Sequence, residues 1–286
     1  NYGKKFYGLS TLRTGIEKSR NLMTVRIAQE LGLSKITNLT KKLNIYKNPE
    51  ELMSISLGSA ETTLLKLTSA YCSFVNGGKL IKPILIDRIQ DSEGNTIFNS
   101  ETRSCGDCEK ISYLSKKLPK IEDNFIKVFS PQTAYQITSM LEGVVQRGTG
   151  KKLSNLNLDL AGKTGTTNKN TDTWFIGYTS NLVVGVYIGY DDPKSLGRYE
   201  TGSKTAMPVF RTFIEDAINK ENARPFKVSK GIKMMVVDAK TGKKASYGST
   251  DTIIEAFKTK DLSKNSFEEN EFLNYKIKEN NIFNFY

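Results

Sequence analysis

The segment from Ala161 to Thr167, AGKTGTT, holds the residue types and spacing that most directly suggest chemistry. Its threonines supply hydroxyl donors, and its glycines let the backbone of a ligand lie close to the chain. Gly162-Lys163-Thr164 matches the end of a phosphate-binding P-loop, GxxxxGK followed by serine or threonine. That pattern needs glycine where the sequence has Asn157, and it opens a helix, whereas strand-like runs follow Gly165. A phosphate site is therefore not the favoured interpretation.

The sequence contains no histidine, and this restricts the catalytic mechanisms open to it. Ser-His-Asp and Cys-His catalysis are excluded, and so are zinc sites of the HExxH type. Any general base must be lysine, aspartate, glutamate or tyrosine. Lys163, with hydroxyl side chains beside it, is therefore the natural candidate for a group that carries protons.

The three cysteines do not define a metal site. Cys105 and Cys108 form a CxxC in a polar stretch, but a zinc site needs two further ligands and only Cys72 remains. A thioredoxin-like redox pair needs a βαβ setting, which is not predicted around this stretch. We expect either a small disulfide within the loop or two free thiols. Cys72 lies in an apolar helical pattern and is expected in the core.

The elements that must position Lys163 form an α+β pattern. Apolar residues three and four apart predict helices, and strand-forming runs between turn residues predict strands. Ser130 followed by Pro131 is typical of a helix start, with serine as the cap and proline in the first turn. Predicted helices cover residues 11–18, 22–31, 33–43, 60–75, 130–146 and 206–219, and predicted strands cover 84–90, 96–98, 158–164, 173–178, 182–190 and 232–237. This order favours an α+β domain over βαβ units.

The net charge of +12 does not by itself indicate an anionic polymer as a partner. The lysines are scattered and are not interleaved with aromatic residues, so we expect a solvated basic surface and no nucleic-acid binding. No stretch approaches the roughly 18 consecutive apolar residues of a membrane span, and no signal peptide is visible. Residues 99–125 are predicted to be a polar insertion, and residues 259–286 a charged, poorly ordered tail.

Around Lys163 the sequence resembles the KTG region of high-molecular-mass penicillin-binding proteins, and most closely that of the bifunctional class A enzymes. The similarity covers DLAGKTGTT at 159–167, DTWFIGY at 172–178 and the apolar run at 183–190. Upstream, residues 12–33 resemble the SxN region, which identifies Ser19-Arg20-Asn21 as the SxN motif. Further blocks match in the expected order, at 57–58 through 76–78, at 148–150 and at 201–210, and together the blocks extend over about residues 5–258.

The resemblance implies the penicillin-recognising α+β fold, with an antiparallel sheet flanked by helices. It implies a serine-type D,D-transpeptidase that cross-links peptidoglycan stem peptides. Ser19 would relay protons to Lys163, and Asn21 would bind the amide carbonyl of the substrate. The motif residues Thr164, Gly165, Thr166 and Thr167 would bind substrate, with the Thr166 amide as half of an oxyanion hole.

The same resemblance implies partners and a location. D-Ala-D-Ala stem peptides and β-lactams would be the ligands, with no metal or organic cofactor. The site would face the periplasm, at the extracytoplasmic side of the bacterial membrane, and a missing N-terminal anchor would supply the attachment to that membrane.

Simpler structural roles remain open for several of these residues. Ser19 could cap the helix at 22–31, Asn21 could be a solvent-facing cap, and Lys163 could be an exposed strand lysine. Trp174, the single tryptophan, is expected to pack in the sheet core. Residues 147–150 are expected to form a turn that positions the sheet.

The chain departs from the family pattern ahead of the SxN motif. In the family, the acylated serine and a partner lysine form an SxxK motif ahead of SxN, but no serine in this sequence has lysine three positions later. We therefore expect residues 1–258 to be the C-terminal portion of a transpeptidase domain, N-terminally incomplete and inactive alone. The alternatives are a non-catalytic scaffold of this fold and a β-lactamase or β-lactam sensor.

Overall fold

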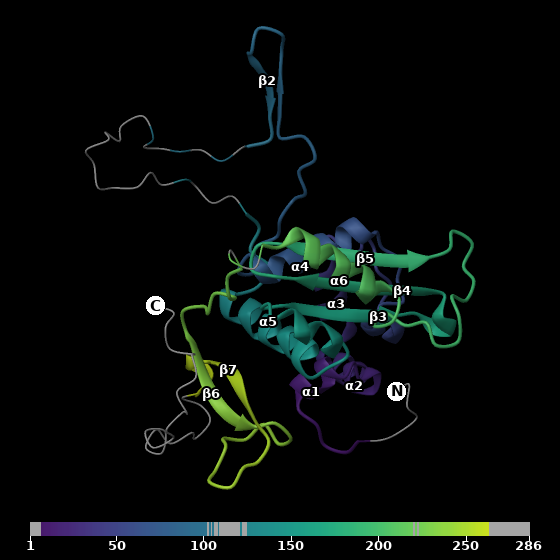
Figure 1. Cartoon of the computed structure of the whole chain (residues 1–286), viewed down its shortest axis with the longest axis vertical. Coiled ribbons are helices and arrows are strands. Elements are labelled where there is room, and N and C mark those ends of the chain that lie inside the picture. Colours follow the sequence, from purple (N-terminus) through teal and green to yellow (C-terminus); the bar gives the residue numbers. More distant parts are fainter. Residues whose placement is uncertain are drawn as a thin grey trace. The chain divides into compact units, whose positions relative to one another are not determined.

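The computed structural model describes residues 7–101, 103, 105, 108, 121, 125–219, 221 and 223–262. The chain divides into two compact units, residues 1–230 and residues 231–286. The first unit combines helices with antiparallel strands and contains both predicted motifs (Figure 1). The predicted α+β class, with an antiparallel sheet flanked by helices, is therefore confirmed.

A three-stranded antiparallel sheet, ordered β3-β4-β5, lies at the centre of the first unit. Short turns connect β3 (Ala161–Thr166), β4 (Asp172–Tyr178) and β5 (Val183–Gly189). Lys163 of β3 pairs with Ile176 of β4, and β3 forms one edge of the described sheet. The first strand begins later than predicted, because residues 158–160 connect it to the preceding 3-10 helix, η2 (Lys151–Leu156).

One face of this sheet is covered by α6 (Ala206–Ala217) (Figure 1). Phe175 of β4 packs against Phe210 of this helix, with the two ring centroids 4.7 Å apart and both side chains fully buried. Gly177 leaves the space that the Phe210 ring occupies, since a β-carbon at position 177 would lie 2.6 Å from that ring. The absent side chain at this position therefore sets how closely α6 approaches the sheet.

The opposite face packs against α4 (Leu64–Val75) and α5 (Pro131–Gln146). Tyr178 alternates with Phe175 along β4 and is also fully buried. Its ring contacts Tyr71 of α4, and its hydroxyl donates to Thr138 Oγ1 of α5 at 3.2 Å. Both faces of the sheet are thus buried, which holds the edge strand β3 in place.

Capping side chains set where the helices of the first unit begin. Thr11 caps α1 (Leu12–Glu17) by accepting from the Thr14 amide, and Ser130 caps α5 as predicted, with Pro131 at its first position. The predicted helix from residue 60 begins at Leu64 instead, because Thr63 is its cap. The other helices here are α2 (Asn21–Leu31), α3 (Leu33–Lys42) and the 3-10 helices η1 (Met53–Leu57) and η3 (Asn168–Asn170).

Between α4 and α5 the described residues form a separate hairpin. β1 (Arg88–Gln90) pairs antiparallel with β2 (Thr96–Asn99), so the first strand is shorter than predicted. Cys105 and Cys108 form a disulfide, one of the two expected states, with their Cα atoms 5.5 Å apart. Cys72 of α4 is only partly buried, not in the core as predicted. Most of the polar insertion predicted at 99–125 lies outside the described residues.

The second unit contains a β-hairpin followed by a single turn of helix. β6 (Ile232–Asp238) is predicted from the sequence, but its antiparallel partner β7 (Thr252–Lys258) is not. α7 (Thr259–Leu262) follows at the start of the predicted tail, and the remainder of that tail lies outside the described residues. Within the described part of the chain, no helix has the length and apolar character needed to cross a membrane.

Candidate active site

Lys163 and Ser19 are in direct contact, although 144 positions separate them in the chain. The ammonium of Lys163 donates to Ser19 Oγ at 2.7 Å and to the Thr164 carbonyl at 2.9 Å. β3 supplies the lysine, and the turn between α1 and α2 supplies the serine. The two predicted motifs therefore meet at the edge of the sheet.

The surroundings of Lys163 make its ammonium easier to deprotonate than that of an exposed lysine. Burial lowers the pKa of Lys163 from 10.5 to about 8, because the charged form loses hydration. In about one molecule in ten, the Lys163 side chain is then neutral at pH 7. A neutral amine can accept a proton from the bonded hydroxyl, and the ammonium form can stabilise an anion, so this contact suits proton transfer.

The backbone presents Ser19 to the lysine by an unusual turn. Ser19 adopts a left-handed conformation with φ of +50°, which is uncommon for a residue other than glycine. Its amide donates to the Ile16 carbonyl at 3.1 Å, so the turn closes on the last residues of α1. Arg20, not Ser19, occupies the cap position of α2, and Asn21 is an exposed first residue of that helix. The simpler role of Ser19 as a helix cap is therefore wrong.

The threonines of the KTG segment differ in their partners. Thr164 Oγ1 lies 2.9 Å from Thr149 Oγ1, so this hydroxyl faces the loop after α5. Thr167 Oγ1 accepts from the Asp172 amide at 2.9 Å and belongs to the turn into β4. Thr166 is exposed, and its hydroxyl accepts from the Gly202 amide at 3.0 Å. Thr166 accepts at its hydroxyl oxygen, so its hydroxyl proton can be donated to a ligand. The Thr167 hydroxyl already donates to the Asp172 carbonyl at 3.2 Å, and the Thr164 hydroxyl is bonded to Thr149.

Gly165 and Trp174 are paired residues of β3 and β4. A β-carbon at Gly165 would lie 3.0 Å from Trp174 Cβ, so a larger side chain would press on the tryptophan. Trp174 is partly exposed rather than buried in the sheet core as predicted. Its indole donates to Asp172 Oδ1 at 2.9 Å, and its ring packs edge-on against Tyr187.

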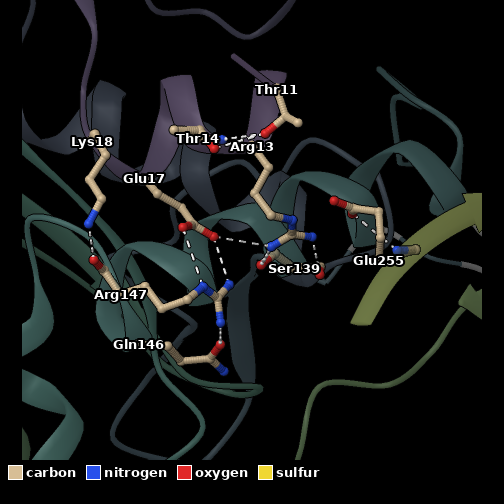
Figure 2. A network of polar contacts seen from close by, with 10 residues as sticks. Thr11, Arg13, Thr14, Glu17, Lys18, Ser139, Gln146, Arg147 and Glu255 are labelled. Atoms are coloured by element: carbon tan, nitrogen blue, oxygen red, sulfur yellow. Dashed lines mark hydrogen bonds and ion pairs between the residues drawn. The ribbon is translucent and has the colours of Figure 1, made fainter. Parts of the chain in front are cut away.

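A cluster of charged side chains joins α1 to the end of α5 and consists of Arg13, Glu17 and Arg147 (Figure 2). Glu17 Oε1 is 2.7 Å from Arg147 Nη2 and 3.5 Å from Arg13 Nη1. Arg13 also donates to the carbonyl and the hydroxyl of Ser139 in α5, at 2.8 and 2.9 Å. Neither Arg13 nor Glu17 is predicted from the sequence as a functional residue, although their spacing of four in a helix is typical of an ion pair.

The arrangement of acids and thiols does not point to a metal centre. Among the residues that the structure describes, no three His, Cys, Asp or Glu side chains gather so that they could hold a metal ion. The chemistry available at the site is that of Lys163, the hydroxyls around it and the backbone amides of the edge strand β3.

Comparisons with known proteins place this chain in a known family. The model of the penicillin binding protein transpeptidase domain matches residues 1–215. Penicillin-binding protein 1A of Rickettsia conorii is 43% identical over 264 residues, which cover 92% of this chain and 33% of that protein. The corresponding protein of Pseudomonas aeruginosa is 30% identical, over 90% of this chain and 35% of its own length. The chain thus spans about a third of the curated relatives that it matches.

Solved structures agree with this assignment. Penicillin-binding protein 1A from Haemophilus influenzae superposes with a TM-score of 0.77 at 29% identity, covering 90% of this chain and 41% of that one. PonA1 from Mycobacterium tuberculosis, solved in complex with penicillin V, shares the fold with a TM-score of 0.62 at 18% identity. By fold, by identity and by the matched model, the chain belongs to the penicillin-binding protein transpeptidase family.

Proposed function

We propose that this chain supplies the SxN and KTG motifs of the active site of a serine-type D,D-transpeptidase that cross-links peptidoglycan stem peptides. The observation that carries the proposal is the 2.7 Å contact between Lys163 and Ser19. Residues so far apart in the sequence meet here at an edge strand, and the lysine has a pKa suited to proton exchange near neutral pH.

In the proposed reaction, a serine oxygen attacks the carbonyl carbon of the penultimate D-Ala, and the bond to the terminal D-Ala amine breaks. Ser19 and Lys163 pass the serine proton to that leaving amine. A neighbouring stem amine then attacks the acyl-enzyme and releases the serine, and its proton returns by the same route.

Binding of the substrate involves the edge strand. Thr166 would donate to the terminal carboxylate of the stem peptide, and a hydrogen bond to a charged group contributes about 1.5–3 kcal/mol. The amide of Thr166 would stabilise the oxyanion, and Asn21 would bind the peptide carbonyl. Thr164 would act mainly by holding the strand, because its hydroxyl is bonded to Thr149.

The acylated serine is proposed to lie outside these 286 residues, since no serine here is followed by lysine at the third position. The segment that carries it would complete the site from a longer polypeptide. Such a protein would act at the periplasmic side of the membrane and would be trapped by β-lactams as a covalent acyl-enzyme.

Labelling of the full-length protein with a fluorescent penicillin tests this proposal. We expect a covalent, serine-dependent band in the full-length protein and none in residues 1–286 alone. Lys163→Ala should abolish the band while leaving the melting temperature nearly unchanged. Lys151→Ala, at an exposed lysine of η2, is the control and should label normally.

Three other outcomes would contradict the proposal. Acylation of Lys163→Ala at the wild-type rate would refute the assigned site. Absence of any serine-dependent band from the full-length protein would indicate a non-catalytic scaffold. Rapid hydrolysis of benzylpenicillin would indicate a β-lactamase instead.

A further inference from the structure

We propose that Glu17, Arg147 and Thr149 are positioning residues. They hold Ser19 of the SxN motif within hydrogen-bonding distance of Lys163 of the KTG motif. This inference rests on the proposed function, because it treats the Lys163–Ser19 contact as the working geometry of the site. The three residues form a connection between the end of α1 and the edge strand β3.

The first part of the connection joins α1 to the end of α5. The Glu17 side chain is only 7% exposed, and its carboxylate pairs with Arg147 at 2.7 Å, while Lys18 donates to the Arg147 carbonyl. A buried carboxylate needs such partners, since leaving one unpaired inside a protein is costly. The position of the α1 terminus is therefore tied to residue 147 by charge as well as by packing (Figure 2).

The second part runs through Thr149 and reaches the KTG strand. The Thr149 amide donates to the Glu17 carbonyl at 3.1 Å, and its hydroxyl lies 2.9 Å from Thr164 Oγ1. Glu17 is two residues before Ser19, and Thr164 is the neighbour of Lys163. Thr149 thus contacts the end of α1, just before the SxN motif, with its backbone, and the KTG motif with its side chain.

The Ser19 turn passes this restraint on to the hydroxyl. The Ser19 and Arg20 amides donate to the carbonyls of Ile16 and Gly15, so the turn moves with the last residues of α1. A shift of the helix end would therefore displace Ser19 Oγ from Lys163. Misplacement of a reacting group by about 1 Å can cost on the order of 100-fold in rate.

The first experiment measures the pKa of Lys163 in the 286-residue chain by following its ε-methylene NMR signals with pH. We expect a value near 8 in the wild type. Thr149→Val keeps the shape of the side chain and the backbone amide but loses the hydroxyl that contacts Thr164. Strand β3 should then be held less firmly, and the Lys163 ammonium should become more hydrated. The pKa of Lys163 should therefore rise to about 9 or higher. Thr149→Ser should restore the wild-type value, because it restores the hydroxyl.

Glu17→Gln, which keeps the shape but removes the charge, should give the same rise. The matched control is Glu215→Gln, which removes the Arg211–Glu215 pair of α6 and should leave the pKa of Lys163 unchanged. These two residues are four apart, as are Arg13 and Glu17 in α1. If Glu17→Gln does not fold, the Thr149 series alone decides. An unchanged Lys163 pKa in folded Thr149→Val would overturn the proposal.

The second experiment measures the rate of acylation by fluorescent penicillin in the full-length protein. Thr149→Val should acylate about 10–100-fold more slowly than wild type, and Thr149→Ser should acylate within a few-fold of wild type. An acylation rate in Thr149→Val equal to that of wild type would contradict the positioning role. If the pKa of Lys163 moves as expected but wild type does not acylate at all, the positioning role stands and the proposed function fails.

Discussion

Replacing Gly143 with alanine should destabilise the protein, although alanine is the better helix former. Gly143 lies inside α5, where a change from glycine to alanine ordinarily stabilises a helix by about 0.5–1 kcal/mol. A β-carbon at this position would lie 2.6 Å from Glu17 Cδ and 2.8 Å from Arg147 Nη2. Alanine would therefore push apart the buried ion pair.

The loss of stability can be estimated from how exposed the Glu17 and Arg147 side chains are. Breaking a buried ion pair costs about 3–5 kcal/mol. The Arg147 side chain is 38% exposed and can be rehydrated, so we take the lower end, about 3 kcal/mol. Subtracting about 1 kcal/mol for the helix propensity of alanine leaves a net loss of about 2 kcal/mol. For a unit of this size, such a loss lowers the melting temperature by about 4–8 °C.

Urea unfolding followed by circular dichroism measures this loss, and Gly15→Ala is the control. Gly15 also lies inside a helix, α1, but its β-carbon would meet only the flexible end of Met23, at 3.1 Å. We expect Gly15→Ala to be neutral or slightly stabilising. In a Glu17→Ala background the contact with the Glu17 carboxylate is gone, and the 38% exposed Arg147 side chain can move away from the new methyl group. Gly143→Ala should therefore cost almost nothing there.

Two results would refute this reasoning. If Gly143→Ala is as stable as wild type, the Glu17–Arg147 pair accommodates a methyl group at residue 143 without loss. An equal cost in the wild-type and Glu17→Ala backgrounds would mean that the destabilisation does not pass through Glu17.

Three further predictions concern the same unit. Burial, and then the negative charge of Asp159, raise the pKa of Glu142 from 4.5 to about 7. Between these two pH values the folded state binds more protons than the unfolded state, so the free energy of unfolding falls as the pH rises through this range. Glu142→Gln should remove that slope and stabilise the protein at pH 8 by up to about 3 kcal/mol, as measured by urea unfolding at pH 5 and pH 8. Gly78→Ala should be much more destabilising than Gly77→Ala in thermal melts: both have positive φ, but only at Gly78 would a β-carbon press on a backbone carbonyl, that of Phe129. Ser130→Ala should cost about 1 kcal/mol, and Ser130→Asp should recover most of it, because the cap of α5 accepts a hydrogen bond from the helix backbone.

Local signals in the sequence predict the centre of the fold and the two motifs. The start of α5 follows from Ser130 and Pro131, whose cap chemistry acts within a few residues. The strands around Lys163 follow from apolar runs between turn residues. The start of α4 is misplaced because Ala60 continues an apolar pattern, while the cap that ends it, Thr63, is a weaker signal. β7 is missed because its apolar residues are interrupted by Glu255.

The parts that sequence reasoning does not reach depend on tertiary packing. The ion pair of Glu17 with Arg147 joins residues 130 positions apart, and no local pattern encodes such a distance. The left-handed conformation of Ser19 is likewise not predictable from local sequence, since serine rarely adopts it without support from the surrounding structure. The motif identifies the residues, but only the packing of α1 against α5 brings them together.

The separation of Ser19 and Lys163 also bears on how the site tolerates change during evolution. Their contact closes a loop of 144 residues, and the entropy of closing a flexible loop grows only with the logarithm of its length. The predicted polar insertion, about 27 residues at 99–125, lies inside this loop, and deleting it would change the closure free energy by about 0.2 kcal/mol. The insertion can therefore lengthen, shorten or acquire new binding partners while the site that it interrupts stays almost equally easy to assemble.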